Sequence, residues 1–349
     1  MKGTPYDFFV QWHLTERCNL KCRHCYQSAA VSEMGYEEIC GAVDNVRDAF
    51  QSWVTEYGME MSPSFHFTGG EPLLRQDLFP ILDYVRGRGF SVSLMSNGTL
   101  IDSDMARRIR EAQIKDVQIS LDGLEATHDS LRGKRSFQRT LKGIGNLLAQ
   151  GVEANINLTV SRINVGQTRE LVRLAEELGV SAIAFSRLVP TGRGKGLSSE
   201  ALTREEVAYF YGELRGYRDS SKVVVTSRDP LAAVADMAGE VIPQVEMPIG
   251  GCAAGIFGVT ITSDGTIMPC RRMDLPIGNI KEVSFRELWA GSPVLWSLRR
   301  REEYHGGCES CRYWAVCRGC RAIALACTRA RGEEDFLGAD PQCPYRCPL

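Results

Sequence analysis

Three cysteines near the start of the chain have a spacing that could bind a metal cluster. Cys18, Cys22 and Cys25 form the pattern C-x3-C-x2-C. A [4Fe–4S] cluster normally takes four thiolates, so three thiolates in one loop would leave one iron open to a small chelating molecule. The alternative is a zinc site with His24 as fourth ligand, but zinc ligands usually come in two pairs, and no second pair follows before position 252. The spacing favours a cluster with an open iron.

Composition excludes several classes of function. The chain has 349 residues and a net charge of −2, so neither a nucleic-acid nor an anionic-membrane partner is indicated. No apolar run approaches the ~20 residues that span a bilayer, and the N-terminus lacks the layout of a signal peptide. We therefore expect a cytoplasmic protein, in which thirteen cysteines indicate metal or redox chemistry rather than disulfides.

The cysteines divide the chain into two functional regions. Three lie at the start, nine lie between Cys252 and Cys347, and none lies between residues 60 and 250. Cys40 stands alone within a helical pattern and is expected to be a packing residue. We predict a first domain over 1–200, a linker or helical connection over 201–250, and a cysteine-rich domain over 251–349.

Short apolar runs alternate with helical patterns through the first region. The expected strands cover 8–14, 64–68, 91–95, 117–121, 154–160 and 183–187, and the expected helices cover about 36–57, 77–86, 102–112, 136–150 and 166–178. This alternation predicts parallel βα units and an α/β fold. Six units fit a partial (β/α)6 TIM-type barrel better than an open sheet. His13 is expected to be a strand residue whose hydrogen bonds are satisfied.

The polar motifs of this region follow the expected strands. Several motifs come directly after strands. They are the loop that carries Cys18, Cys22 and Cys25 (the cysteine loop), the segment Gly69-Gly70-Glu71-Pro72, and the polar residues near positions 97, 122 and 187. Loops after the strands of a parallel barrel share one mouth, so these residues should meet there. The glycine-rich segment 191–196 lacks a phosphate-loop pattern and is expected to be a mobile linker.

Together these motifs resemble the radical S-adenosylmethionine superfamily. The resemblance rests on C-x3-C-x2-C followed by Tyr26, and on Gly69-Gly70-Glu71-Pro72 at a strand end. It implies a [4Fe–4S] cluster on Cys18, Cys22 and Cys25, with S-adenosylmethionine on its open iron. The implied cofactor-binding residues are Tyr26 near the adenine, Gly69, Gly70, Glu71 and Pro72 at the methionine amine, Asn97, Ser120 and Asp122 at the ribose, the carboxylate or the substrate cavity, and Arg132 at the cofactor carboxylate.

The C-terminal cysteines form a second pattern, which resembles the SPASM domain with its two auxiliary iron–sulfur clusters. The resemblance assigns the first cluster to Cys252, Cys270 and Cys320, and the second to Cys308, Cys311, Cys317 and Cys343. An upstream cysteine seen in relatives is missing. The first cluster is therefore expected to be [2Fe–2S], to have an open iron, or to recruit Cys327 or Cys347. The alternative is a zinc ribbon built from Cys308, Cys311, Cys317 and Cys320.

The C-terminal motifs are most similar to a subgroup that contains mycofactocin and pyrroloquinoline quinone maturases and alternative haem-pathway enzymes. The resemblance implies reductive cleavage of S-adenosylmethionine to a 5′-deoxyadenosyl radical that takes a hydrogen atom from the substrate. The favoured substrate is a ribosomally made peptide that is crosslinked or oxidised. The alternatives are tetrapyrrole side-chain modification, a sulfatase-type maturase, or an iron–sulfur electron carrier without catalysis.

Two kinds of protein partner are expected beside the substrate. One is an electron donor such as flavodoxin or ferredoxin, and the other is a separate peptide-recognition protein. The sequence identifies no residue that handles protons, and fold and cofactor do not define the substrate.

Overall fold

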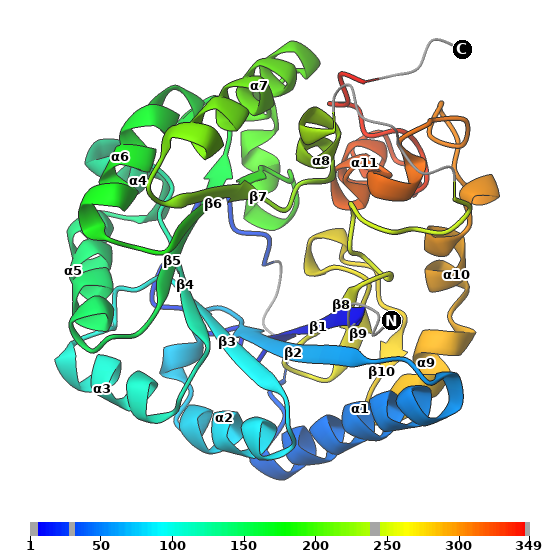
Figure 1. The fold of residues 1–349 in the computed structure, drawn as a ribbon, viewed down its shortest axis with the longest axis horizontal. Helices are drawn as coiled ribbons and strands as arrows, with labels where there is room; N and C mark the ends of the chain where they lie inside the picture. Colours follow the sequence, from blue (N-terminus) through cyan, green and yellow to red (C-terminus); the bar gives the residue numbers. More distant parts are fainter. Residues whose placement is uncertain (1–5, 28–31, 238–244, 346–349) are drawn as a thin grey trace.

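The computed structural model describes residues 6–27, 32–237 and 245–345, so Cys347 lies outside the described residues. A ring of helices surrounds a curved sheet whose concave face lines the centre of the ring (Figure 1). None of the helices in the described ranges is long and apolar enough to cross a membrane.

The sheet confirms the expected parallel barrel and extends it at both edges. Its ten strands follow the order β10-β9-β8-β1-β2-β3-β4-β5-β6-β7, and neighbours from β8 through β1 to β7 are parallel. The strands are β1 Tyr6–His13, β2 Met61–Thr68, β3 Ser91–Ser96, β4 Asp116–Ser120, β5 Ala154–Val160, β6 Ala182–Arg187, β7 Val224–Ser227, β8 Gly258–Ile261, β9 Thr266–Met268 and β10 Gly278–Asn279.

The two regions of the chain share this sheet. Strand β8 pairs with β1 from Phe9↔Gly258 to Trp12↔Ile261, and it turns back into the antiparallel strand β9. The hairpin of β8 and β9, which lies between Cys252 and Cys270, therefore continues the barrel sheet. At the other edge β7 pairs with β6, inside the segment expected to be a connection. The domain division at 200 and 250 stays a prediction.

The helices surround the sheet: α1 to α7 lie on its convex side, and α8 and α11 lie between its two edges (Figure 1). They are α1 Tyr36–Tyr57, α2 Leu78–Gly87, α3 Ser103–Glu111, α4 Glu125–Arg132, α5 Ser136–Ala149, α6 Thr168–Leu178, α7 Arg204–Ser220, α8 Pro230–Asp236, α9 Phe285–Gly291, α10 Pro293–Arg299 and α11 Arg321–Arg329. Helix α7 begins with a reciprocal cap between Thr203 and Glu206. Helix α4 was not expected from the sequence.

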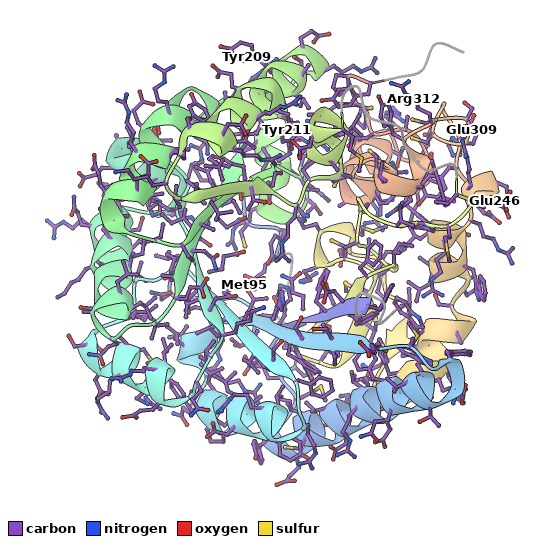
Figure 2. The ribbon with its side chains drawn as sticks, in the orientation of Figure 1. Met95, Tyr209, Tyr211, Glu246, Glu309 and Arg312 are labelled. Carbon is purple, nitrogen blue, oxygen red and sulfur yellow. The ribbon has the colours of Figure 1, made fainter. Side chains whose placement is uncertain are left out.

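Alternation along β1 separates the core from the interior of the barrel. Trp12 packs against phenylalanines of β2 beneath the helices, whereas Phe9 stacks on His66. Gln11, on the same face as Phe9, points its side-chain nitrogen at the sulfur of Met95, 3.9 Å away. Figure 2 shows Met95 at the inner side of the ring. The same face of β1 ends with His13, which therefore faces the interior near the mouth.

Candidate active site

The cysteine loop lies on the backbone of the glycine pair that follows β2. The N–H of Gly70 donates to the carbonyl of Thr15 at 2.7 Å, and that of Glu71 donates to Arg17 at 2.8 Å. A Cβ on Gly70 would stand 2.1 Å from the Arg17 carbonyl oxygen, and one on Gly69 would stand 2.2 Å from that of Thr15. Both glycines are therefore required for two loops to meet backbone to backbone.

Glu71 joins the end of β2 to the end of β3. Its carboxylate is fully buried and accepts from the Ser96 hydroxyl at 2.8 Å and the Asn97 N–H at 2.9 Å. Burial raises the pKa of Glu71 to about 7. The Asn97 side-chain nitrogen donates to Asn19 at 2.9 Å and lies 4.0 Å from the Cys18 sulfur. Pro72 begins the short 3-10 turn that follows Glu71.

Asp122 fixes a second set of groups under the cysteine loop. Its buried carboxylate pairs with Arg132, lies 3.1 Å from His24 Nε2 and accepts the Thr159 N–H at 2.7 Å. Although burial raises the pKa of Asp122, Arg132 and His24 hold it well below the usual range. Arg132 also reaches to 3.9 Å from the Cys22 sulfur. Both carboxylate oxygens of Asp122 are thus used within the protein.

The glycine-rich segment after β6 packs on the same loop, so the expectation of a mobile linker is wrong. Residues 192–200 form 3-10 turns. Arg193 Nε donates to the carbonyl of Cys22 at 3.0 Å, and a Cβ on Gly192 would stand 2.5 Å from the carbonyl oxygen of Tyr26. Glycine composition suggested flexibility here, whereas the glycines instead permit close backbone contact.

The donor groups of the cysteine loop fit an iron–sulfur cluster. Burial raises the pKa of Cys18 to about 11 and also raises that of Cys22, so these thiols are neutral until a metal displaces their protons. The N–H groups of Asn97 and Arg132 approach the Cys18 and Cys22 sulfurs, as hydrogen bonds to cluster sulfurs do.

A single metal ion fits these groups less well. Within the described ranges no three Cys, His, Asp or Glu side chains converge on one point as a single ion requires. A cluster places its irons at separate corners and needs no such convergence. His24, the candidate fourth zinc ligand, has its Nε2 engaged by Asp122, which leaves only Nδ1 as a possible metal ligand.

Tyr26 and His13 lie together above the barrel interior. Their rings meet edge to face with centroids 5.7 Å apart, and His13 is buried whereas Tyr26 is half-buried. Burial lowers the pKa of His13 to about 3, so its ring is neutral. The expectation of satisfied hydrogen bonds is wrong, because neither ring nitrogen has a partner among the described residues. Ser120 lies half-buried at the end of β4.

The auxiliary cysteines separate into two groups in space. Cys320 lies in a small apolar cluster, and Cys252, Cys270 and Cys327 pack against it. In the second group, Cys308 lies close enough to Cys317 and Cys343 to raise the pKa of both thiols, and Cys343 also raises that of Cys317, although burial has the larger effect. The Cys311 N–H donates to the Cys308 carbonyl at 3.2 Å. These groups coincide with the interleaved sets implied by the sequence, with Cys327 beside the first. Their metal ligation stays a prediction.

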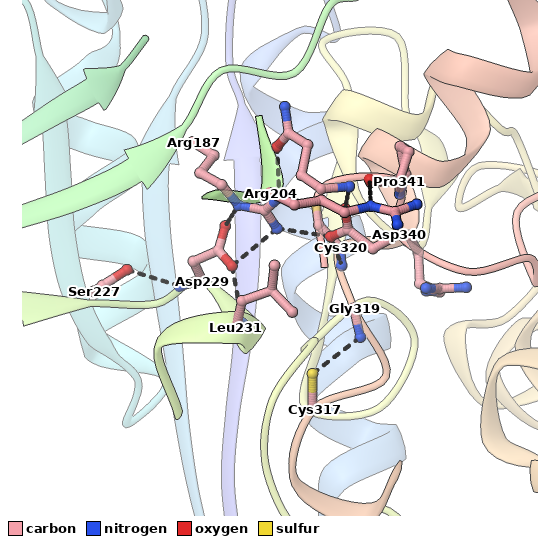
Figure 3. A network of polar contacts seen from close by, with 12 residues as sticks. Arg187, Arg204, Ser227, Asp229, Leu231, Cys317, Gly319, Cys320, Asp340 and Pro341 are labelled. Carbon is pink, nitrogen blue, oxygen red and sulfur yellow. Dashed lines mark hydrogen bonds and ion pairs between the residues drawn. The ribbon is translucent and has the colours of Figure 1, made fainter. Parts of the chain in front are cut away.

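A buried arginine links the barrel to the region that carries the auxiliary cysteines, from Cys252 onward (the auxiliary region). Arg187, at the end of β6, pairs with Asp229 at 2.7 Å and with Asp340 at 2.7 Å (Figure 3). Asp340 also accepts the N–H of Cys320 at 2.9 Å. Arg187 is therefore a structural bridge, which the sequence pattern did not reveal. The sequence also gave no signal for the contact of Arg193 with the cysteine loop. For a role of His13, the only hint in the sequence was its position on the inward face of the first strand.

Two family profiles match the chain. The radical SAM superfamily matches residues 12–175, and the SPASM iron–sulfur cluster-binding domain matches residues 252–321. AdoMet-dependent heme synthase of Nitratidesulfovibrio vulgaris is 30% identical over 99% of this chain and 94% of its own length. That of Methanosarcina barkeri is 32% identical over 97% and 96%. Mycofactocin maturase MftC of Mycobacterium ulcerans is 28% identical over 98% and 89%.

Solved structures share the fold. anSMEcpe with bound AdoMet has a TM-score of 0.72 at 21% identity, over 96% of this chain and 93% of that chain. Streptococcus suis SuiB bound to S-adenosylmethionine has a TM-score of 0.73 at 16% identity, over 99% and 78%. The zinc alternatives and the electron carrier without catalysis are set aside by the family matches and the full-length similarity to enzymes. The chain belongs to the radical S-adenosylmethionine superfamily: it is an enzyme whose barrel binds a [4Fe–4S] cluster and S-adenosylmethionine, and whose SPASM domain binds auxiliary iron–sulfur clusters.

Proposed function

We propose that this enzyme modifies a carboxylate-bearing side chain of a tetrapyrrole, with loss of the carboxyl group. The observation that carries the proposal is the 30–32% identity to three AdoMet-dependent heme synthases, each over at least 97% of this chain. The sequence patterns alone favoured a peptide substrate. The full-length similarity reverses that order, because the relatives named for heme synthesis are more similar to this chain than the mycofactocin maturases.

The interior of the barrel offers groups that suit an anionic substrate. A pocket on the concave face of the sheet is lined by Ser64, His66, Ser91, Ser93, Met95, Lys115, Asp116, Gln118, Asn155 and Arg228. Lys115 and Arg228 supply two cations, and both lie close enough to His66 to lower its pKa, although burial has the larger effect. Two cations against one acidic residue favour binding of a carboxylate.

The residues around the cysteine loop would hold the cofactors in this proposal. Bound S-adenosylmethionine supplies, on one-electron reduction, a 5′-deoxyadenosyl radical that abstracts a hydrogen atom. Cys18, Cys22 and Cys25 would ligate the cluster, and Tyr26, the Gly69–Pro72 loop, Asn97 and Ser120 would contact the cofactor. Asp122 would act through Arg132, whose guanidinium it orients. An external donor of the flavodoxin or ferredoxin type would supply the electron for cofactor cleavage, in the cytoplasm. An auxiliary cluster would accept the one electron left on the substrate when the carboxyl group leaves as CO2.

A peptide substrate is the second candidate. Three mycofactocin maturases are 28% identical over 98% of this chain, and a structure of SuiB bound to its precursor peptide SuiA has a TM-score of 0.72. In that case the concave face of the sheet would receive a peptide side chain, and a separate recognition protein would deliver the peptide.

The test uses the full chain reconstituted with iron and sulfide without oxygen. It is incubated with S-adenosylmethionine, dithionite and iron coproporphyrin III, a tetrapyrrole with four carboxylate side chains. The proposal predicts a product that has lost carboxyl groups, together with 5′-deoxyadenosine, as measured by mass spectrometry. Reactions without S-adenosylmethionine are the control. Cofactor cleavage with an unchanged tetrapyrrole would contradict this substrate and favour the peptide.

A further inference from the structure

Unpartnered polar groups gather where the barrel interior meets the auxiliary region. Both ring nitrogens of His13, Nε of Arg271 and Oε1 of Glu16 are buried without a hydrogen-bond partner in the described parts of the chain. His13 is 0% exposed and Arg271 is 5% exposed. Buried polar atoms are nearly always paired, and each unpaired one costs free energy. Several at one place indicate that a polar ligand completes the site.

The three residues come from different elements that meet at the mouth. His13 ends β1, Glu16 begins the cysteine loop, and Arg271 follows Cys270 after the hairpin of β8 and β9. The Arg271 backbone is fixed by a hydrogen bond from its N–H to the Thr260 hydroxyl at 3.1 Å. Its cation lies close enough to His13 to lower the pKa of that ring further, beyond the effect of burial. His13, Glu16 and Arg271 therefore form one site, and their unpartnered atoms belong together.

Arg271 forms two long ion pairs with its own neighbours. Its two terminal nitrogens lie 3.7 Å from Glu16 and 3.5 Å from Asp274, both long for a hydrogen bond. Oε2 of Glu16 also accepts a hydrogen bond from the side-chain nitrogen of Gln27 at 2.8 Å, and burial raises the pKa of Glu16. The terminal nitrogens of Arg271 thus face carboxylates of the protein, and its Nε is the donor left without a partner.

We propose that Arg271 and His13 together bind a carboxylate of the substrate at the mouth of the barrel. The guanidinium Nε–H and one ring N–H of His13 would donate to the two carboxylate oxygens, which pairs Arg271 Nε and one of the two ring nitrogens of His13. This inference rests on the proposed function, because it names the acidic side chain of that substrate as the ligand. It also places one acidic arm beside the cysteine loop, while Lys115 and Arg228 remain for others.

The position along β1 supports a specificity role. Phe9, Gln11 and His13 share one face of the strand, so His13 is the member of this row nearest the cysteine loop. A substrate carboxylate bound by His13 and Arg271 would hold the substrate side chain that carries it next to the cofactor. Arg271 and His13 are binding residues in this inference, and neither is assigned a proton transfer.

The test measures binding of iron coproporphyrin III to the reconstituted enzyme by absorbance titration. Arg271→Gln should weaken binding about 10- to 100-fold, as expected for loss of a charge-assisted hydrogen bond. His13→Phe should weaken it about tenfold, and His13→Gln, which keeps a donor, less. Arg299→Gln is the matched control, because Arg299 is another partly buried arginine with an unpartnered nitrogen, but it stacks on Trp289. The affinity of the Arg299→Gln variant for iron coproporphyrin III should stay at the wild-type value.

A methyl-esterified coproporphyrin separates charge from shape. The esters should bind wild-type enzyme and Arg271→Gln about equally, because the variant lacks only the carboxylate partner. Wild-type enzyme that binds no tetrapyrrole would overturn the proposed function and this inference together. Unchanged tetrapyrrole affinity in Arg271→Gln would overturn this inference alone, as would a defect confined to the S-adenosylmethionine KM or to the cluster spectrum.

Discussion

The two cysteine-bearing regions are held in place by different means. The first cysteine loop rests on strand ends, where main-chain hydrogen bonds to Gly70 and Glu71 fix its path. Much of the auxiliary region from residue 300 onward lacks strands and is organised by buried arginines. Arg318 donates to the carbonyls of Gly250, Cys252, Trp314 and Ala315. Arg193 also supports the first loop, at the carbonyl of Cys22, whereas the irregular buried backbone of the auxiliary region takes four such hydrogen bonds from Arg318 alone.

The largest expected effect separates the two regions by function. Changing Cys18, Cys22 and Cys25 together to Ala should reduce 5′-deoxyadenosine formation to background, because no other described group is placed to hold that cluster. Auxiliary-cluster absorbance should remain, since Cys252, Cys270, Cys320 and the second group lie in a separately organised region. The measurement is product chromatography with iron analysis. A variant that still cleaves S-adenosylmethionine would contradict the assignment of the open-iron cluster.

The second prediction tests whether side chains hold the auxiliary region. Arg318→Lys keeps the charge but cannot span four carbonyls, so it should lower the free energy of unfolding by roughly 2 to 4 kcal/mol. Iron should be lost from the auxiliary clusters first, while S-adenosylmethionine cleavage persists. The exposed Arg331→Lys is the control. Iron loss from the cysteine loop at the same rate would show that the two regions are not held independently.

Much of the first region could be predicted from the sequence because its signals are local. Apolar alternation and glycine-containing loops mark strand ends, and the fold itself brings strand ends together. The bridge from Arg187 to Asp340 could not be predicted, because it joins positions 153 apart and depends on burial rather than pattern. The unpaired nitrogens of His13 are likewise visible only once β8 and the Arg271 loop are placed against β1.

The third prediction sharpens the division within the auxiliary region. Cys327, on α11, packs against the apolar cluster that contains Cys320, so we expect it to complete the ligands of the first auxiliary cluster. Cys327→Ala should change the electron paramagnetic resonance signal of one cluster and leave the others unchanged. Cys40→Ala, which lies in α1, is the control and should change no cluster signal. An unaltered spectrum in Cys327→Ala would leave an open iron, a [2Fe–2S] cluster or ligation by Cys347 as the better assignment.

The smallest expected effect concerns the barrel interior and its pH dependence. Burial, with smaller effects of Arg228 and Lys115, lowers the pKa of His66 to about 4 from 6.5. In the unfolded chain His66 therefore binds a proton below pH 6.5, whereas in the folded chain it stays neutral until about pH 4. The free energy of unfolding consequently falls as the pH drops through this window. His66→Gln should reduce the loss of unfolding free energy between pH 7 and 5 by about 1 to 2 kcal/mol. Urea unfolding at both pH values measures it. An equal loss in wild type and variant would show that His66 titrates in the folded barrel as it does in the unfolded chain, so that it would add a third cation beside Lys115 and Arg228 only below pH 6.5.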